Sequence, residues 1–278
     1  MSTEYGKGSI FSVPDLRDYR GVTSQAEFPK EFSLLMPAVK NQGSVSSCVA
    51  HSLATVCEYY NTKQNSPLEM STGYIYGNRL LSTHKGSGMY TRDAIKTLAK
   101  FGDVPYDCFM PNVEVPDAIR LFEKYADDEL MELGTIYRID SYFKLKDDAA
   151  MKSHLLSGNP IIFAMKWFDD IKLEDGVMIT QQVVTKKTGG HCMVIYGWNE
   201  QGWLVQNSWG KHWGADGRFT LPYNIPRKET WGVIDAKSTT LVEIKKPFNS
   251  KFGEWCAKII HKIITCAYNI YYKIKERK

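Results

Sequence analysis

The sequence lacks the motifs that mark several large classes of protein. None of its six cysteines belongs to a CxxC pair, and neither GxxxxGK[ST] nor GxGxxG, the glycine motifs that bind phosphate, is present. There is no HExxH motif and no close grouping of His, Cys and Asp at metal-ligand spacing. We therefore expect no metal site and no cofactor.

Long apolar stretches are also missing. The first twenty residues contain no apolar core of the kind that a secretory signal peptide requires. No run approaches the ~18 apolar residues of a transmembrane helix. The cysteines are typical of free thiols rather than of a disulfide framework. These features together predict a reducing, cytoplasmic location.

Little net charge lies outside the C-terminal end. Residues 251–278 hold seven Lys or Arg and two Glu, a net charge of +5, so the other 250 residues carry −1 of the total of +4. A general nucleic-acid-binding protein is expected to have a basic face on its folded body. We therefore expect no nucleic acid partner.

The same C-terminal segment has a helical pattern. Apolar residues recur every three or four positions through residues 250–278, with lysines between them, which predicts a basic amphipathic helix. Two interpretations stay open. The helix could dock onto the protein's own body or a second copy, or it could bind a membrane surface or a protein partner.

Helical and strand-like patterns occupy different parts of the chain. Their order predicts an α+β fold of two lobes. The expected units are an N-terminal arm (1–30), a helical lobe (31–133), a β-rich lobe (134–245) and the basic amphipathic helix (246–278). Helices are expected at 48–63, 71–82, 91–101, 116–133 and 147–157, and strands fill most of the β-rich lobe.

Cys48 stands in a context that suits catalysis. It begins the predicted helix 48–63, whose positive end favours a thiolate, and it follows the polar stretch VKNQGSVSS. A buried structural cysteine is the alternative, and we expect that role for Cys57, Cys108, Cys256 and Cys266.

His191 and Asn207 form the second candidate feature. His191 opens a strand after two glycines, and Asn207 follows sixteen residues later at the end of the next strand. A tight β-hairpin with its turn near residues 199–202 would place these two residues side by side.

Three segments resemble the papain-like cysteine peptidase family. NQGSVSSCVAHS is similar to the nucleophile segment, GGHCMVIYGW to the histidine segment and NSWGKHWGADGRFTL to the asparagine segment. His191 lies 143 residues after Cys48 and Asn207 lies 159 after it, against about 130–150 in the family. Weaker similarity spans residues 14–225 and is strongest to bacterial-type members. The resemblance implies a papain-like fold with a helical left lobe and a β-barrel-like right lobe.

The resemblance also implies site roles. Cys48 would be the nucleophile, His191 its base and then the acid for the leaving amine, and Asn207 the residue that orients the histidine. The Gln42 side-chain amide and the Cys48 N–H would hold the oxyanion.

Two further positions complete the implied site. Gly88 would bind the substrate backbone, and Trp209 would shield the Asn–His bond and flank the primed side of the cleft. Val45 replaces a cysteine that normally forms a disulfide, which is consistent with a reducing compartment.

The stretch ahead of Gln42 is too short for the long inhibitory prosegment of secreted family members. We therefore expect activity to be limited by compartment, by narrow specificity or by a partner.

The sequence thus predicts a cysteine endopeptidase that acts on peptide or protein substrates through a Cys48 acyl-enzyme. An amidase acting on cell-wall peptides would use the same catalytic residues and is one alternative. The other is a catalytically weak or inactive papain-fold scaffold, in which the C-terminal helix supplies the interaction.

Overall fold

The computed structural model describes residues 5–15, 18, 27–168, 171–179 and 188–235. The predicted C-terminal helix, and with it the whole of 246–278, lies outside the described residues.

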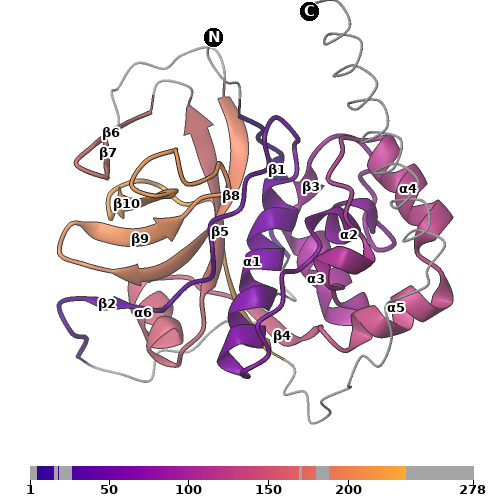
Figure 1. Ribbon diagram of the computed structural model, residues 1–278. Coiled ribbons are helices and arrows are strands. Elements are labelled where there is room, and N and C mark those ends of the chain that lie inside the picture. The colour runs from indigo at the N-terminus through magenta and orange to yellow at the C-terminus, as the bar shows by residue number, and fades with distance from the viewer. Residues whose placement is uncertain (1–4, 16–17, 19–26, 169–170, 180–187, 236–278) are drawn as a thin grey trace, which may run out of the picture.

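A nine-stranded sheet forms one side of the molecule (Figure 1). All of its strand pairs are antiparallel except β10 with β7. In order across the sheet the strands are β4 (Ile139–Lys144), β11 (Glu229–Asp235), β5 (Ile161–Phe168), β8 (Thr188–Trp198), β9 (Gly202–Gln206), β10 (Arg218–Pro222), β7 (Val177–Ile179) and β6 (Lys172–Glu174), while β2 (Phe32–Ser33) also pairs with β8.

Helices form the other side of the molecule, and α1 lies between them and the sheet (Figure 1). A small separate sheet joins β1 (Ser9–Ile10) to β3 (Met89–Tyr90). The helices are α1 (Cys48–Lys63), α2 (Thr72–Gly77), α3 (Thr91–Phe101), α4 (Asp117–Tyr125), α5 (Asp128–Thr135) and α6 (Asp148–Leu156), with one 3₁₀ turn at Tyr106–Cys108.

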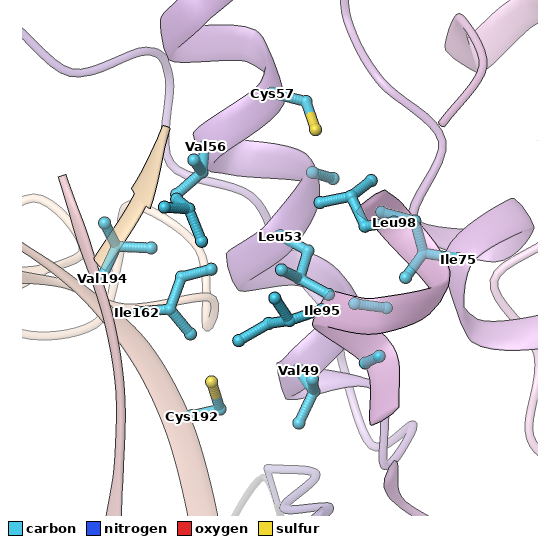
Figure 2. Close-up of a cluster of buried hydrophobic side chains, with 14 of the residues drawn as sticks. Val49, Leu53, Val56, Cys57, Ile75, Ile95, Leu98, Ile162, Cys192 and Val194 are labelled. Atoms are coloured by element: carbon cyan, nitrogen blue, oxygen red, sulfur yellow. The ribbon is translucent and has the colours of Figure 1, made fainter. Parts of the chain in front are cut away.

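Helix α1 is buried all round rather than along one stripe. Every residue from Cys48 to Asn61 is buried, as expected for a helix that is covered on both sides. Figure 2 shows Leu53 of α1 beside Ile95 of α3, with Ile162 of β5 approaching from the sheet. Because this packing fixes α1, it also fixes the position of Cys48 at its first turn.

The central strands β5 and β8 separate two apolar cores. Ile162 and Val194 belong to the core around α1, whereas Phe163 and Ile195 belong to a second core on the opposite face. This follows from the two-residue period of a strand, whose side chains point alternately to the two faces. Both faces are therefore covered, which explains why these strands are almost wholly apolar.

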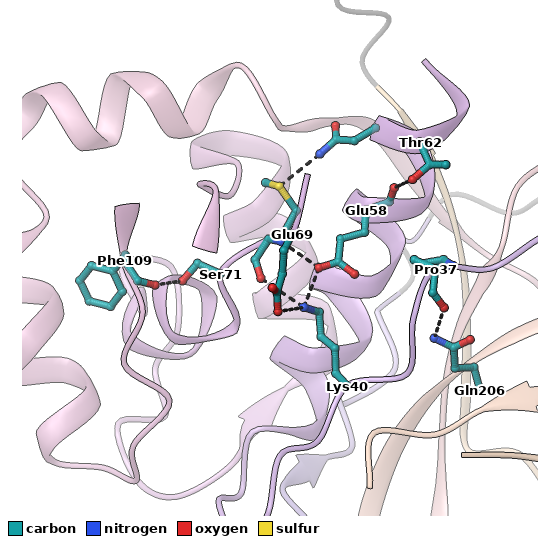
Figure 3. Close-up of polar contacts among 10 residues, drawn as sticks. Pro37, Lys40, Glu58, Thr62, Glu69, Ser71, Phe109 and Gln206 are labelled. Carbon is teal, nitrogen blue, oxygen red and sulfur yellow. Dashed lines mark hydrogen bonds and ion pairs between the residues drawn. The ribbon is translucent and has the colours of Figure 1, made fainter. Parts of the chain in front are cut away.

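The segment before α1 is attached to the helix by a buried charge cluster (Figure 3). Lys40 Nζ lies 2.6 Å from Glu58 Oε1 of α1 and 3.4 Å from Glu69 Oε1, and Glu58 also accepts a hydrogen bond from the Met70 N–H. The Lys40 and Glu58 side chains are 10% and 8% exposed. The cluster thereby holds the chain that leads to Gln42 against α1.

The predicted helices agree with the structure to different degrees. The helices at 48–63 and 91–101 are confirmed at both ends, and 147–157 differs by one residue at each end. The predicted helix 116–133 is wrong as one element, because Asp127 is extended and its side chain caps α5 by accepting from the Leu130 N–H. The predicted helix 71–82 ends early at Gly77, since Asn78 is extended.

Candidate active site

Cys48 is the first residue of α1 and is fully buried. The backbone of Cys192, the residue after His191, interacts with its sulfur, so β8 lies directly against the start of α1. Burial raises the pKa of the Cys48 thiol to about 11, although nearby backbone N–H groups act in the opposite direction. In this arrangement the cysteine is a neutral thiol.

His191 and Asn207 are brought together by the predicted hairpin. Strands β8 and β9 pair antiparallel across a turn closed by the hydrogen bond from the Asn199 N–H to the Gly202 carbonyl. His191 Nε2 lies 2.8 Å from Asn207 Oδ1. The side-by-side placement predicted from the sequence is confirmed.

This hydrogen bond decides which nitrogen of His191 carries the proton. An amide oxygen only accepts hydrogen bonds, so Nε2 must be the donor and, in the neutral ring, Nδ1 keeps its lone pair. Nδ1 is buried and has no hydrogen-bond partner among the described residues. It is therefore free to take a proton.

Aromatic rings enclose the histidine. The Trp209 ring is stacked on His191 at 4.5 Å between centroids, and Trp167 meets it edge-on at 5.3 Å. Burial lowers the pKa of His191 to about 4, while the hydrogen bond to Asn207 acts to raise it. Burial thus works against the thiolate–imidazolium pair that the family resemblance implies.

Gln42 is held with its amide nitrogen turned toward residues 5–12. Its Oε1 accepts a hydrogen bond from Ser208 Oγ at 2.6 Å, which leaves Nε2 to donate to the carbonyls of Gly6 and Val45. The Gln42 N–H also donates to the Ser208 carbonyl. The serine next to Asn207 therefore fixes the orientation of the predicted oxyanion donor.

Gly88 lies in a loop attached to the start of the nucleophile helix. It has a φ of +80°, which favours glycine, and its N–H donates to the Tyr76 hydroxyl. Glu114 connects this loop to the nucleophile segment by accepting hydrogen bonds from Ser87 Oγ at 3.0 Å and from the Ser46 N–H at 2.7 Å. Sequence reasoning missed Glu114, since an isolated glutamate in a loop gives no signal.

Sequence reasoning also missed the role of the N-terminal arm. Residues 5–12 lie along the site, where the Gly6 carbonyl accepts from Gln42 Nε2 at 2.9 Å and the Gly8 carbonyl accepts from the Met89 N–H at 2.7 Å. The sequence pattern predicts an arm over 1–30 and assigns it no contact with the site.

Other classes of site are not apparent in the described part of the chain. It holds no group of three or more His, Cys, Asp or Glu residues placed to bind a metal ion. None of its helices has the length and apolar content needed to span a bilayer. The four described cysteines, Cys48, Cys57, Cys108 and Cys192, are all free and buried.

Comparisons with known proteins place the chain in a family of related sequences. A profile described as papain family cysteine protease matches residues 29–230. An uncharacterized peptidase C1-like protein of Acanthamoeba polyphaga mimivirus is 29% identical over 208 residues, which cover 68% of this chain and 65% of that protein. Cathepsin B-like CP3 of Giardia intestinalis is 27% identical over 229 residues, covering 78% of this chain and 71% of that protein.

Solved structures share the fold. Xylellain, a cysteine protease from Xylella fastidiosa, superposes with a TM-score of 0.71 and 23% identity over 84% of this chain and 98% of that one. The larval midgut procathepsin L2 of Tenebrio molitor gives a TM-score of 0.63 at 21% identity, over 84% of this chain and 79% of that one. These matches confirm the predicted papain-like α+β fold for the described residues.

Proposed function

Since this chain belongs to the papain family of cysteine proteases, we propose that it is an endopeptidase in which Cys48 is the nucleophile and His191 its base. The hydrogen bond between His191 Nε2 and Asn207 Oδ1 carries the proposal. It leaves the lone pair on Nδ1, the nitrogen that a base at this position would use.

The first step is acylation of the cysteine. His191 Nδ1 takes the Cys48 thiol proton, and the sulfur attacks the carbonyl carbon of the substrate peptide bond. Gln42 Nε2 and the Cys48 N–H donate to the resulting oxyanion. The Cys48 N–H is suited to this because the first N–H groups of a helix have no intrahelical acceptor.

The second step returns the enzyme to its starting state. His191 gives its proton to the leaving amine as the C–N bond breaks, which leaves a thioester on Cys48. Water then attacks the thioester with His191 as base, releasing the acid product and restoring the thiol. Asn207 keeps the imidazole oriented throughout.

Contacts already present in the structure support the proposed substrate site. The Met89 N–H next to Gly88 already binds a peptide carbonyl, that of Gly8, so it can do the same for a substrate strand. The buried Trp209 ring is stacked with another aromatic ring, that of Tyr5, at 4.8 Å between centroids. We assign substrate binding to Gly88 and Trp209 on these grounds.

The proposal is tested by incubating the full chain with a mixed peptide library and reading the cleaved bonds by mass spectrometry. We expect internal cleavages that disappear in Cys48→Ala. No cleavage by the wild-type chain, although a thiol reagent modifies Cys48, would favour the inactive scaffold instead.

The roles proposed for the remaining parts of the chain need separate tests. We propose a cytoplasmic location, which the free thiols of the described residues support. For residues 250–278 we retain binding to a membrane surface or a protein partner as a proposal. Truncation after residue 248 followed by vesicle sedimentation tests it.

A further inference from the structure

A cavity lies apart from the proposed active site, between α1 and the segments that precede and follow it. Its volume is about 670 Å³, which is within the range typical of small-molecule sites. Its lining comes from residues 37–41, from His51, Glu58 and Thr62 of α1, and from the stretches 67–72 and 106–112. Neither Cys48 nor His191 contributes to the wall, so the cavity is a separate place on the molecule.

One wall of the cavity is the charge cluster of Figure 3. The Lys40 ammonium has three N–H groups and meets three acceptors, so it has none left for an anion. The acceptors are Glu58 Oε1 at 2.6 Å, Glu69 Oε1 at 3.4 Å and the Met70 carbonyl at 3.5 Å. Because both glutamates use Oε1 here, each Oε2 is left to accept from a ligand. One lysine against two glutamates gives this wall a net charge of −1.

His51, which also lines the cavity, is held in one tautomer. Its Nδ1 lies 3.0 Å from the Ser47 carbonyl oxygen, which can only accept, so Nδ1 carries the proton. The Ser47 hydroxyl agrees with this assignment. It donates its own hydrogen to Asn112 Oδ1 at 3.0 Å and can therefore only accept from His51 Nδ1. In the neutral ring, the lone pair is then on Nε2.

The Nε2 atom of His51 is open to a ligand in the cavity. It has no hydrogen-bond partner within the described part of the chain. Unlike Nδ1 of His191, it is not sealed among buried atoms, although the residue as a whole is only 3% exposed. Burial lowers the pKa of His51 to about 4, so at neutral pH the ring is uncharged and Nε2 is an acceptor.

These open polar atoms require a ligand that donates hydrogen bonds. His51 Nε2 and the Oε2 atoms of Glu58 and Glu69 are all acceptors. Pro67 and Tyr106 add flat faces to the lining. A guanidinium group matches both features, because it is planar, carries five N–H donors and no acceptor, and stacks on flat rings. Its positive charge also suits the net negative charge of the wall.

We propose that this cavity binds a small guanidinium compound through His51 Nε2 and the carboxylates of Glu58 and Glu69. The site adjoins the turn that carries the proposed nucleophile, since Ser47, which accepts from His51, directly precedes Cys48. Binding requires no peptidase activity and is measured directly. Its failure would therefore leave the proposed function untouched.

The test is isothermal titration calorimetry of the full chain with free arginine at pH 7.5. Citrulline is the matched control compound, because it differs from arginine only in a neutral ureido group in place of the guanidinium. We expect arginine to bind with a dissociation constant of the order of millimolar and citrulline to bind at least about tenfold more weakly. No binding of arginine, or equal binding of the two compounds, would overturn the proposal.

A matched pair of variants assigns the binding to this cavity. Glu69→Gln keeps the size of the side chain and removes its charge, and we expect arginine to bind about three- to tenfold more weakly. The control is Glu200→Gln. Glu200 pairs with Lys30 at 3.5 Å much as Glu69 pairs with Lys40 at 3.4 Å, and both glutamates are mostly exposed, but Glu200 does not line the cavity. Equal affinities in the two variants would contradict the site.

The histidine is tested separately. His51→Phe keeps a flat ring and removes the acceptor, and we expect about tenfold weaker binding of arginine in a variant that circular dichroism shows to be folded. Should that variant unfold, Glu69→Gln still decides the question. In long-range ¹H–¹⁵N spectra of the wild-type chain, arginine should shift His51 Nε2 and leave His84 Nε2, which contacts the Ser87 carbonyl at 3.0 Å, unchanged. A shift at His84 alone would place the ligand near the Gly88 loop and overturn the proposal.

Discussion

In the buried site, the pKa values of Cys48 and His191 are shifted in the directions that oppose catalysis. A nucleophile and its base work best when they are charged or easily charged. Burial instead raises the pKa of Cys48 to about 11 and lowers the pKa of His191 to about 4. The Lys7 side chain of the arm contributes to the lowered pKa of His191. A change that removed this positive charge or admitted water to the site would favour the ion pair.

At the residue scale, the first prediction concerns Asn207. Asn207→Ala removes the acceptor for the His191 Nε2–H, a hydrogen bond worth about 1.5–3 kcal/mol once the ring is charged. We expect kcat to fall about ten- to a hundredfold with little change in KM, measured by steady-state kinetics on one peptide. Asn207→Asp keeps an oxygen acceptor and should restore part of kcat, whereas an equal loss in both variants would contradict an orienting role.

The sequence was informative about side chains at the site and uninformative about backbone contacts. The placement of His191 beside Asn207 could be predicted because strand spacing and a turn signal fix a hairpin register. The position of residues 5–12 along the site could not be predicted, because they bind through carbonyl and N–H groups of a kind that every residue carries. Only the alternation of Gly6 and Gly8 hinted at close backbone approach.

At the scale of elements, α1 depends on the segment that precedes it. Lys40 is the cation that compensates the buried Glu58 carboxylate. It also pairs with Glu69, whose side chain lies at the surface. Removal of one member leaves the other charge buried and uncompensated. Breaking the pair therefore lowers the free energy of unfolding by more than the intact pair contributes to it.

We therefore predict that Lys40→Ala lowers the free energy of unfolding by about 3–5 kcal/mol, measured by urea denaturation. The matched control is Lys30→Ala. Lys30 pairs with Glu200 at 3.5 Å, but their side chains are 87% and 73% exposed, so the loss should stay below about 1 kcal/mol. Similar losses in the two variants would show that burial of the Lys40 pair is not the cause.

The same variant should show a distinct pH dependence. Burial raises the pKa of Glu58 and Lys40 lowers it, so the pKa of Glu58 rises further in Lys40→Ala. The folded state then binds a proton that the unfolded state has released, and stability falls as the pH rises above the unfolded pKa of about 4.3. We expect the difference from wild type to be larger at pH 8 than at pH 5 in urea titrations, and a pH-independent difference would contradict this account.

The boundaries of the helices and strands show why sequence patterns predicted the secondary structure only in part. Helices α1 and α3 have regular apolar spacing over their whole length and were predicted closely. The break between α4 and α5 depends on Asp127, whose side chain competes for the Leu130 N–H and so ends one helix and starts the next. Strand β11 (Glu229–Asp235) pairs with both β4 and β5. The local pattern that predicts strands in this lobe does not say which of them pair, because the partners are distant in the sequence.

At the scale of the whole molecule, residues 40–42 and 208–210 join the helical side to the sheet. The Gln42 N–H donates to the Ser208 carbonyl at 2.8 Å, and the Gly210 N–H donates to the Lys40 carbonyl at 3.0 Å. The Ser208 hydroxyl adds a third hydrogen bond to this junction by donating to Gln42 Oε1. The junction unites the proposed oxyanion donor and the proposed catalytic asparagine, which are far apart in the sequence.

We predict that Ser208→Ala lowers kcat about tenfold, because the Gln42 amide loses the contact that orients it. KM for the same peptide should change little. Ser208→Thr retains the hydroxyl and should recover most of kcat. If Ser208→Ala lowers thermal stability but leaves kcat unaltered, the hydroxyl is structural only.

The close packing of Gly6 and Gly8 has a genetic consequence. A Cβ at either position would lie within 2.0 Å of a carbonyl oxygen in the loop before Cys48. A glycine codon becomes an alanine codon by one base change, so among natural alleles of this gene we expect these two codons to vary only at the third base, which leaves glycine in place.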